Sequence, residues 1–125
     1  MPRPILPEHQ IHPAIRERVA SHQHGFVQTV QAAVAAHDVL VVGMAMNPFP
    51  RKARRALHAA GVPHHYLEFG SYLSRWRERN ALKLWTGWPT FPMVFVRGVL
   101  VGGASEVQRL IDSGELTRLV APRLE

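Results

Sequence analysis

Histidine is the most abundant side chain in this sequence that can do chemistry near neutral pH, and the chain contains eight. Neutral imidazole is a common metal ligand, and the shortest spacings are His22-x-His24 and His64-His65. Because adjacent side chains of a strand point to opposite faces of a sheet, His64 and His65 are poorly placed to share one ion. No spacing follows an established zinc pattern. We therefore predict no metal site and expect surface or packing roles for the histidines.

Sulfur and hydroxyl nucleophiles are excluded more directly. The chain has no cysteine, so it cannot form a disulfide, ligate an iron–sulfur cluster through a thiolate, or attack a substrate with a thiol. No serine lies in a Gly-x-Ser-x-Gly motif. Four serines are instead expected in caps or turns: Ser71, Ser74, Ser105 and Ser113.

The main charged feature of the chain, whose net charge is +6, is a basic cluster on a predicted helix: Arg51, Lys52, Arg54 and Arg55. Such a cluster can attract an acidic partner or nucleic acid, but the sequence shows no nucleic-acid-binding module. We interpret it as the solvated face of a helix whose other face, around Ala53 and Leu57, packs in the core. No nucleic-acid partner is predicted.

Membrane and secretory signals are also lacking. The longest apolar runs, 39–42 and 93–96, are far shorter than the roughly 20 residues that cross a bilayer. The N-terminal residues lack the apolar core of a secretory signal. The sequence therefore predicts a cytoplasmic protein with no membrane partner.

The periodicity of apolar residues predicts an α/β domain in the order helix, strand, helix, strand, helix, strand, strand, helix. The expected strands are 39–42, 62–69, 93–96 and 99–101. Helices fill the stretches between them, with breaks expected at Gly25 and Gly61. This order predicts a four-stranded mixed sheet with helices on both faces. Residues 1–25 are expected to form an N-terminal extension and residues 26–125 the domain.

One helix is predicted to begin at Asn47. Asparagine is among the best N-cap residues, and Pro48 suits the first helical position. Pro50 falls at the third position, where a missing N–H removes no intrahelical hydrogen bond. We expect a capped but slightly irregular helix start.

Another helix is predicted to begin at Ser71 and to run to about Trp85. The three tryptophans, Trp76, Trp85 and Trp88, are interpreted as structural rather than as a recognition surface. Trp76 is expected to pack in the core with Leu73.

Three motifs, taken together, resemble the glutaredoxin family. Asn47-Pro48-Phe49-Pro50 is similar to the Cys-Pro-Phe/Tyr-Cys start of its active-site helix, with both cysteines replaced. Trp88-Pro89-Thr90-Phe91-Pro92 matches the Trp-Pro-Thr-x-Pro signature of the monothiol branch, and residues 96–103 match its hairpin and Gly-Gly turn. The resemblance covers about Asp38 to Val120 and implies the thioredoxin fold.

The resemblance implies that the catalytic sulfur is missing. In this family the first cysteine is the nucleophile, and its thiolate is stabilised at a helix N-terminus. Asn47 and Pro50 occupy the two cysteine positions, and thiol–disulfide exchange cannot proceed without a thiolate. We therefore predict no catalytic residue, loss of oxidoreductase activity, and no iron–sulfur cluster.

The resemblance also implies a glutathione site. Phe91 would offer its backbone N–H and C=O to the cysteinyl unit, as an added strand does. Pro92 would be cis, and Arg79 would pair with the glycyl carboxylate. At the start of the last major helix, after Gly103, the N–H groups of Ala104 and Ser105 would receive the γ-glutamyl carboxylate.

Two departures from the family pattern weaken that site. Met44 stands where the family has a lysine, and Ser105 stands where it has an aspartate. Each lost charged contact would cost about 1.5–3 kcal/mol if buried. Glutathione binding is expected to be weak or lost, although the groove should remain.

Three functions are compatible with these residues. The leading hypothesis is a non-catalytic module, linked to redox homeostasis, that binds glutathione or an extended peptide or protein segment. The second is a glutathione-dependent oxidoreductase, or an iron–sulfur-related glutaredoxin, that uses a thiol supplied by a partner. The third is a pure protein-interaction module that uses the extension 1–25.

Overall fold

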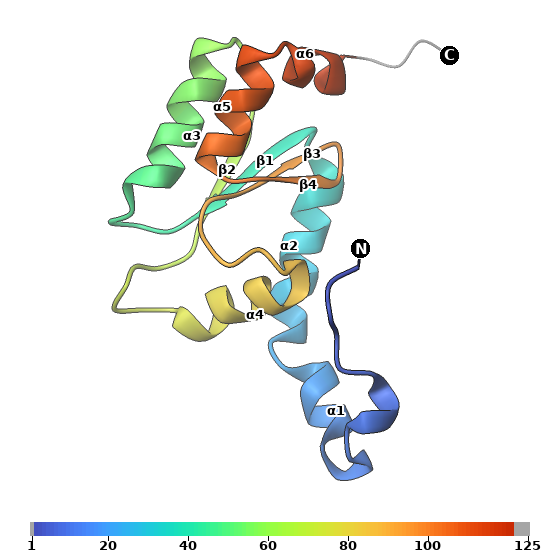
Figure 1. The fold of residues 1–125 in the computed structure, drawn as a ribbon. Coiled ribbons are helices and arrows are strands. Elements are labelled where there is room, and N and C mark those ends of the chain that lie inside the picture. Colours follow the sequence, from blue (N-terminus) through green and yellow to red (C-terminus); the bar gives the residue numbers. More distant parts are fainter. Residues whose placement is uncertain (1, 122–125) are drawn as a thin grey trace.

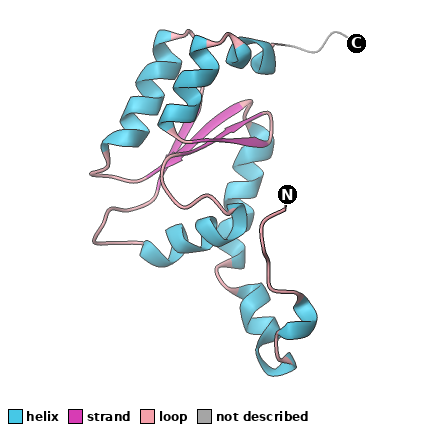
Figure 2. Ribbon diagram, in the orientation of Figure 1, coloured by secondary structure: helices cyan, strands magenta, loops and turns pink. Residues whose placement is uncertain are grey.

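The computed structural model describes residues 2–121 and contains the predicted four-stranded mixed sheet (Figures 1 and 2). The strands are ordered β2-β1-β3-β4. The central strand β1 (Val39–Gly43) runs parallel to β2 (His65–Glu68) and antiparallel to β3 (Met93–Val96), which pairs with β4 (Val99–Gly102). The second strand is shorter than the predicted range 62–69.

Helices cover both faces of the sheet, as predicted. One face carries α3 (Pro48–Ala59), α5 (Ala104–Asp112) and α6 (Glu115–Val120), and the other carries α2 (His24–Ala36) and α4 (Trp76–Thr86) (Figure 1).

The N-terminal residues lead into the domain from one side. A 3-10 turn (Glu8–Gln10) and α1 (Pro13–Ser21) lie beyond the end of α2, away from the sheet (Figure 1). The boundary between an extension (1–25) and a domain (26–125) stays a prediction. Met1 of the extension and residues 122–125 of the domain lie outside the described part of the chain.

The apolar run of β1 is explained by its central position. Val39 and Val41 pack in the core formed with α3, α5 and α6, whereas Leu40 and Val42 pack in the core formed with α2 and α4. Because successive side chains alternate between faces, a strand covered on both faces must be apolar at every position.

Strand pairing brings three segments to one end of the sheet. Val42 pairs with Met93, and Val94 pairs with Gly102. Since β3 is antiparallel to both neighbours, the segments that follow β1 and β4 meet the segment that precedes β3. This end of the sheet therefore holds the start of α3, the Phe91–Pro92 step and the start of α5.

Three local predictions were wrong. The break between the first two helices lies at Gln23, with φ 51°, and Gly25 lies inside α2. Ser71 does not cap α4, which begins at Trp76. Trp76 and Leu73 do not pack in the core, because they are 61% and 92% exposed.

Candidate functional site

Asn47 caps α3 as predicted. Its Oδ1 accepts a hydrogen bond from the N–H of Phe49 at 2.9 Å, and Pro48 is the first helical residue. Its Nδ2 also reaches the carbonyl oxygen of Phe91, 3.4 Å away, which is at the long end for a hydrogen bond. That second contact joins residues 44 positions apart, and no local pattern in the sequence indicates it.

The step before β3 has the predicted geometry. The Phe91–Pro92 peptide bond is cis, and both residues are buried. The Phe91 ring packs in the core shared with α2 and α4, with the Lys83 ammonium 5.9 Å from the ring centroid. The carbonyl of Phe91 is directed to the start of α3 through its contact with Asn47.

The Gly-Gly turn lies against this step. A Cβ atom on Gly103 would lie 3.3 Å from the carbonyl oxygen of Pro92 and 3.7 Å from Nε1 of Trp88. Among the described residues, that buried indole N–H has no acceptor. A side chain at position 103 would therefore crowd the backbone at this point.

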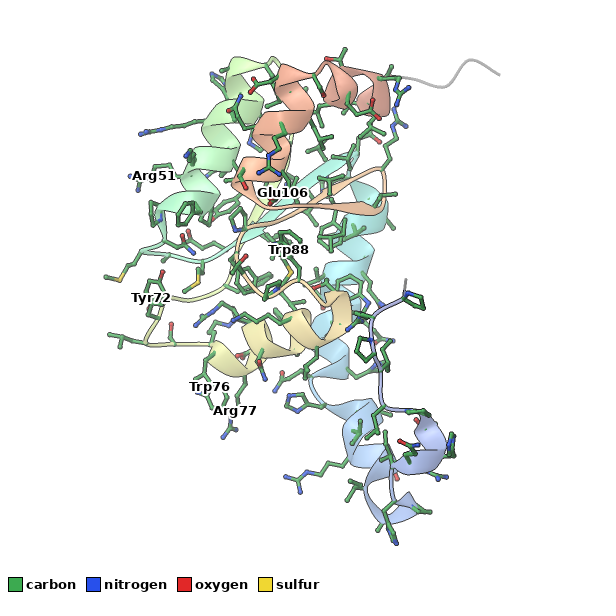
Figure 3. All side chains as sticks on the ribbon, in the orientation of Figure 1. Arg51, Tyr72, Trp76, Arg77, Trp88 and Glu106 are labelled. Carbon is green, nitrogen blue, oxygen red and sulfur yellow. The ribbon has the colours of Figure 1, made fainter. Side chains whose placement is uncertain are left out.

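Glu106 is a site residue that the sequence interpretation missed. Its carboxylate accepts hydrogen bonds from the Gly103 N–H at 2.9 Å and from the Ser105 hydroxyl at 2.8 Å. A glutamate three residues after the N-cap is a known capping signal, and that spacing was present in the sequence. The start of α5, next to Gly103, Ala104 and Ser105, thus already holds a negative charge (Figure 3).

These contacts predict a pH dependence of stability. The Gly103 N–H, followed by the Ser105 hydroxyl, lowers the pKa of Glu106 below its ordinary value of 4.5. A depressed folded-state pKa stabilises the protein above the unfolded pKa, and this contribution is lost as the pH falls through the folded pKa. In denaturant unfolding, the wild type should lose more stability between neutral and strongly acidic pH than Glu106→Gln, and parallel curves would contradict this prediction.

Arg79 is buried in the structure and is hydrogen-bonded to the loop between β2 and α4. It is 7% exposed, and its Nη1 donates to the carbonyl oxygens of Phe69, at 3.0 Å, and of Ser74. It lies one turn before Lys83 on α4, so both side chains lie on the face of the helix near Phe91. Its pairing with a glycyl carboxylate stays a prediction.

Met44 is also buried, in the core shared with α2 and α4. The position at which the family has a lysine therefore contributes packing in this chain and presents no charge to a ligand.

Large apolar side chains in the loops after β1 and β2, and at the starts of the helices that follow, are exposed, which the sequence interpretation did not foresee. Met46 is 78% exposed, and Phe49, Tyr72, Leu73 and Trp76 are also exposed. The Ala45 N–H donates to the Gly70 carbonyl at 2.7 Å, which holds the loops after β1 and β2 together. Figure 3 shows Tyr72 on the second loop, and Trp76 and Arg77 extending from the start of α4 away from the sheet.

Residues 2–121 contain neither a cluster of metal ligands nor a membrane-spanning helix. No three histidine, aspartate or glutamate side chains are grouped so that they could hold a metal ion. No described helix is long and apolar enough to cross a bilayer.

Comparison with known proteins decides the family. The family model described as Glutaredoxin matches residues 39–101. A glutaredoxin-like protein of Dictyostelium discoideum is 38% identical over 98 residues, which are 78% of this chain and 80% of that protein. The chain belongs to the glutaredoxin family.

The structural comparison agrees with this glutaredoxin assignment. Oxidised glutaredoxin 2 of Chlamydomonas reinhardtii superposes with a TM-score of 0.69 at 25% identity, covering 78% of this chain and 92% of that one. A buckwheat glutaredoxin–glutathione complex gives a TM-score of 0.68 at 19% identity, covering 80% and 91%. The glutaredoxin 3 proteins of Danio rerio and Mus musculus are longer, and the chain matches 17% and 19% of their lengths.

Proposed function

We propose that this protein is a binding module of the glutaredoxin family that does not catalyse thiol–disulfide exchange. The ligand would be an extended peptide-like molecule lying along Phe91 and Pro92, either a segment of a partner protein or, more weakly, glutathione. The single observation that carries the proposal is the carboxamide of Asn47 at the N-terminus of α3, bonded to Phe49 and Phe91.

The proposed loss of catalysis follows from the chemistry of that carboxamide. Exchange requires a sulfur that attacks one atom of a disulfide and releases the other. The amide of Asn47 has no such atom, and the chain contains no cysteine elsewhere. Its two polar ends are hydrogen-bonded to the protein, which favours a structural role.

The proposed retention of binding rests on the backbone around Phe91. A segment that precedes a strand at a sheet end can pair with an extended ligand through its N–H and C=O groups. The buckwheat glutaredoxin of similar fold was solved in complex with glutathione. In this chain, however, the Asn47 carboxamide already occupies one of the two acceptor positions of the Phe91 carbonyl oxygen, so a ligand must use the other position or compete with Asn47.

Glutathione meets a further obstacle at the start of α5. The Glu106 carboxylate accepts hydrogen bonds from the Gly103 N–H and the Ser105 hydroxyl, at the helix start where a γ-glutamyl carboxylate would bind. Like charges repel, so this end of the site disfavours glutathione. The exposed apolar side chains nearby, including Met46 and Phe49, favour a longer partner with apolar residues.

Titration with reduced and oxidised glutathione, followed by NMR, tests the ligand. We expect small, saturable shifts at the amides of Phe91, Arg79 and Ala104 in the millimolar range. The variant Glu106→Gln should strengthen binding because it removes the repelling charge. The absence of shifts at these residues in both proteins would eliminate glutathione and leave the partner segment.

A disulfide-reduction assay with glutathione tests the absence of catalysis. The purified protein should give no turnover above the buffer rate, whereas clear turnover would favour the alternative in which a thiol is supplied to this site. A role in cytoplasmic redox homeostasis belongs to the same proposal and is supported by family membership alone.

A further inference from the structure

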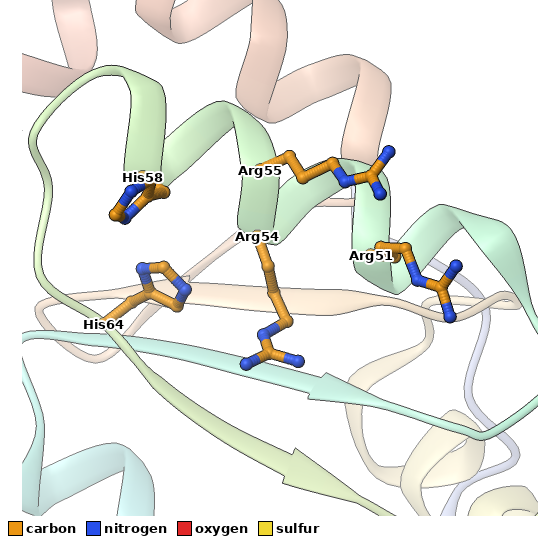
Figure 4. A pocket seen from close by; sticks show the side chains of 5 residues that line it. All are labelled: Arg51, Arg54, Arg55, His58 and His64. Atoms are coloured by element: carbon orange, nitrogen blue, oxygen red, sulfur yellow. The ribbon is translucent and has the colours of Figure 1, made fainter.

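The outward face of α3 carries a row of positive side chains. Arg51, Arg54, Arg55 and His58 lie at positions i, i+3, i+4 and i+7, which is one face of a helix. His64, from the segment before β2, completes a depression of about 410 Å³ that these five residues line. Figure 4 shows His58 and His64 next to each other at one end, Arg51 at the other end and Arg54 between them.

Within the part of the chain that the structure describes, the three arginines have no carboxylate partner. The ion pairs of residues 2–121 are Arg75–Glu78, Arg97–Asp38 and Arg118–Glu115, and none involves the depression. The first turn of α3 also lacks an acidic residue. Positive side chains near a helix N-terminus, and like charges four residues apart, each destabilise a helix by a few tenths of a kcal/mol. A bound anion would relieve both effects.

Arg54 is held in position before any ligand arrives. Its guanidinium lies over the ring of Tyr66, 4.1 Å from the centroid. The Tyr66 hydroxyl in turn donates to Glu68 at 2.9 Å, which fixes the ring. Stacking leaves the N–H groups at the edge of the guanidinium plane free to donate, and a pre-positioned donor loses little conformational entropy on binding.

We propose that this depression, lined by three unpaired arginines and two histidines, binds a small molecule that carries two or more adjacent phosphate groups. Guanidinium groups match phosphate oxygens in bidentate geometry. Three guanidinium groups lie within about one helical turn, which is more than a single phosphate group requires. A diphosphate can pair with more of them than orthophosphate can.

The size of the depression favours a small ligand over nucleic acid. Its volume of about 410 Å³ lies within the range of small-molecule sites, which is about 300–1,000 Å³. Nucleic-acid interfaces of even single modules bury about 600–1,000 Å² of protein surface, whereas this positive patch is confined to one face of α3 and one histidine beside it. The site does not depend on the ligand proposed for Phe91.

Isothermal titration with inorganic pyrophosphate tests the proposal, with orthophosphate and a short single-stranded DNA as comparison probes. Wild-type protein should bind pyrophosphate saturably, about tenfold more tightly than orthophosphate. The variant Arg54→Gln/Arg55→Gln should weaken pyrophosphate binding by at least about tenfold, a change of about 1.4 kcal/mol. Arg109→Gln/Arg118→Gln, which removes the same charge elsewhere, should change it by less than about twofold.

The single variant Arg55→Gln tests binding without disturbing the fold, because Arg55 is exposed and makes no stacking contact with Tyr66. It should retain the wild-type melting temperature and still weaken pyrophosphate binding. Equal effects of the two double variants, no saturable binding at about 10 mM pyrophosphate, or tighter binding of DNA through the same arginines would each overturn the proposal.

Discussion

The variant Asn47→Cys is expected to carry a thiol whose pKa lies below the ordinary value of about 8.5. The N-cap side chain already accepts a hydrogen bond from the Phe49 N–H, and a thiolate there would accept the same donor and interact with the positive end of the α3 dipole. Arg51, one turn into the helix, adds further positive charge. The rate of alkylation by iodoacetamide as a function of pH measures this pKa.

Ser21→Cys provides the matched control. Ser21 is exposed and is the last residue of α1, where the negative end of the helix dipole disfavours a thiolate. Its introduced thiol should titrate at or above about 8.5 and should react more slowly at neutral pH. If the thiol at position 47 titrates no lower than this control, the start of α3 has lost the electrostatic character of a glutaredoxin active site.

The variant Gly43→Ala should destabilise the protein by about 1–3 kcal/mol, the usual cost of inserting a methyl group into a packed region. A Cβ atom at Gly43 would lie 2.7 Å from Cβ of Pro50 and 2.9 Å from the Tyr66 hydroxyl. Pro50 is buried in the first turn of α3, so the helix start must shift to accommodate the methyl group. Denaturant unfolding at neutral pH measures the loss.

Gly25→Ala is the control that separates this steric effect from the general effect of replacing glycine by alanine. Gly25 lies in the first turn of α2, and a Cβ atom there would meet nothing within 4 Å. Because alanine restricts the unfolded chain and favours the helix, this variant should be neutral or more stable by up to about 1 kcal/mol. Destabilisation of both variants to the same extent would mean that Gly43 is not tightly enclosed.

The features that the sequence predicted are those fixed by local chemistry or by strong periodicity. The buried run at 39–42 identifies the central strand because it is apolar at every position. The Asn47 cap followed from the preference of asparagine for this position. The cis bond before Pro92 followed from the family motif.

The wrong predictions came from competing local interactions. The Ser71 hydroxyl accepts from the Leu73 N–H at 3.2 Å, and the Ser74 hydroxyl accepts from the Ser71 N–H at 3.1 Å. Such serine turns compete with helix formation, so α4 begins five residues later and Trp76 faces outward.

The contacts of Arg79 and Asn47 escaped prediction for a different reason. Each reaches a carbonyl group that only the tertiary fold brings near. A sequence pattern can identify the type of side chain at a site, but it does not show which of its hydrogen-bonding groups the protein itself occupies.

The exposure of Met46 has a consequence for how oxidants act on this molecule. Met44 and Met93 are buried, whereas the thioether of Met46 is open to solvent immediately before Asn47. Peroxide that reaches this loop would meet no thiol and would instead convert Met46 to its sulfoxide, which is polar and reversible by methionine sulfoxide reductases. The loop would become hydrophilic at Met46, so oxidation would change the affinity for the partner proposed above and would form no disulfide.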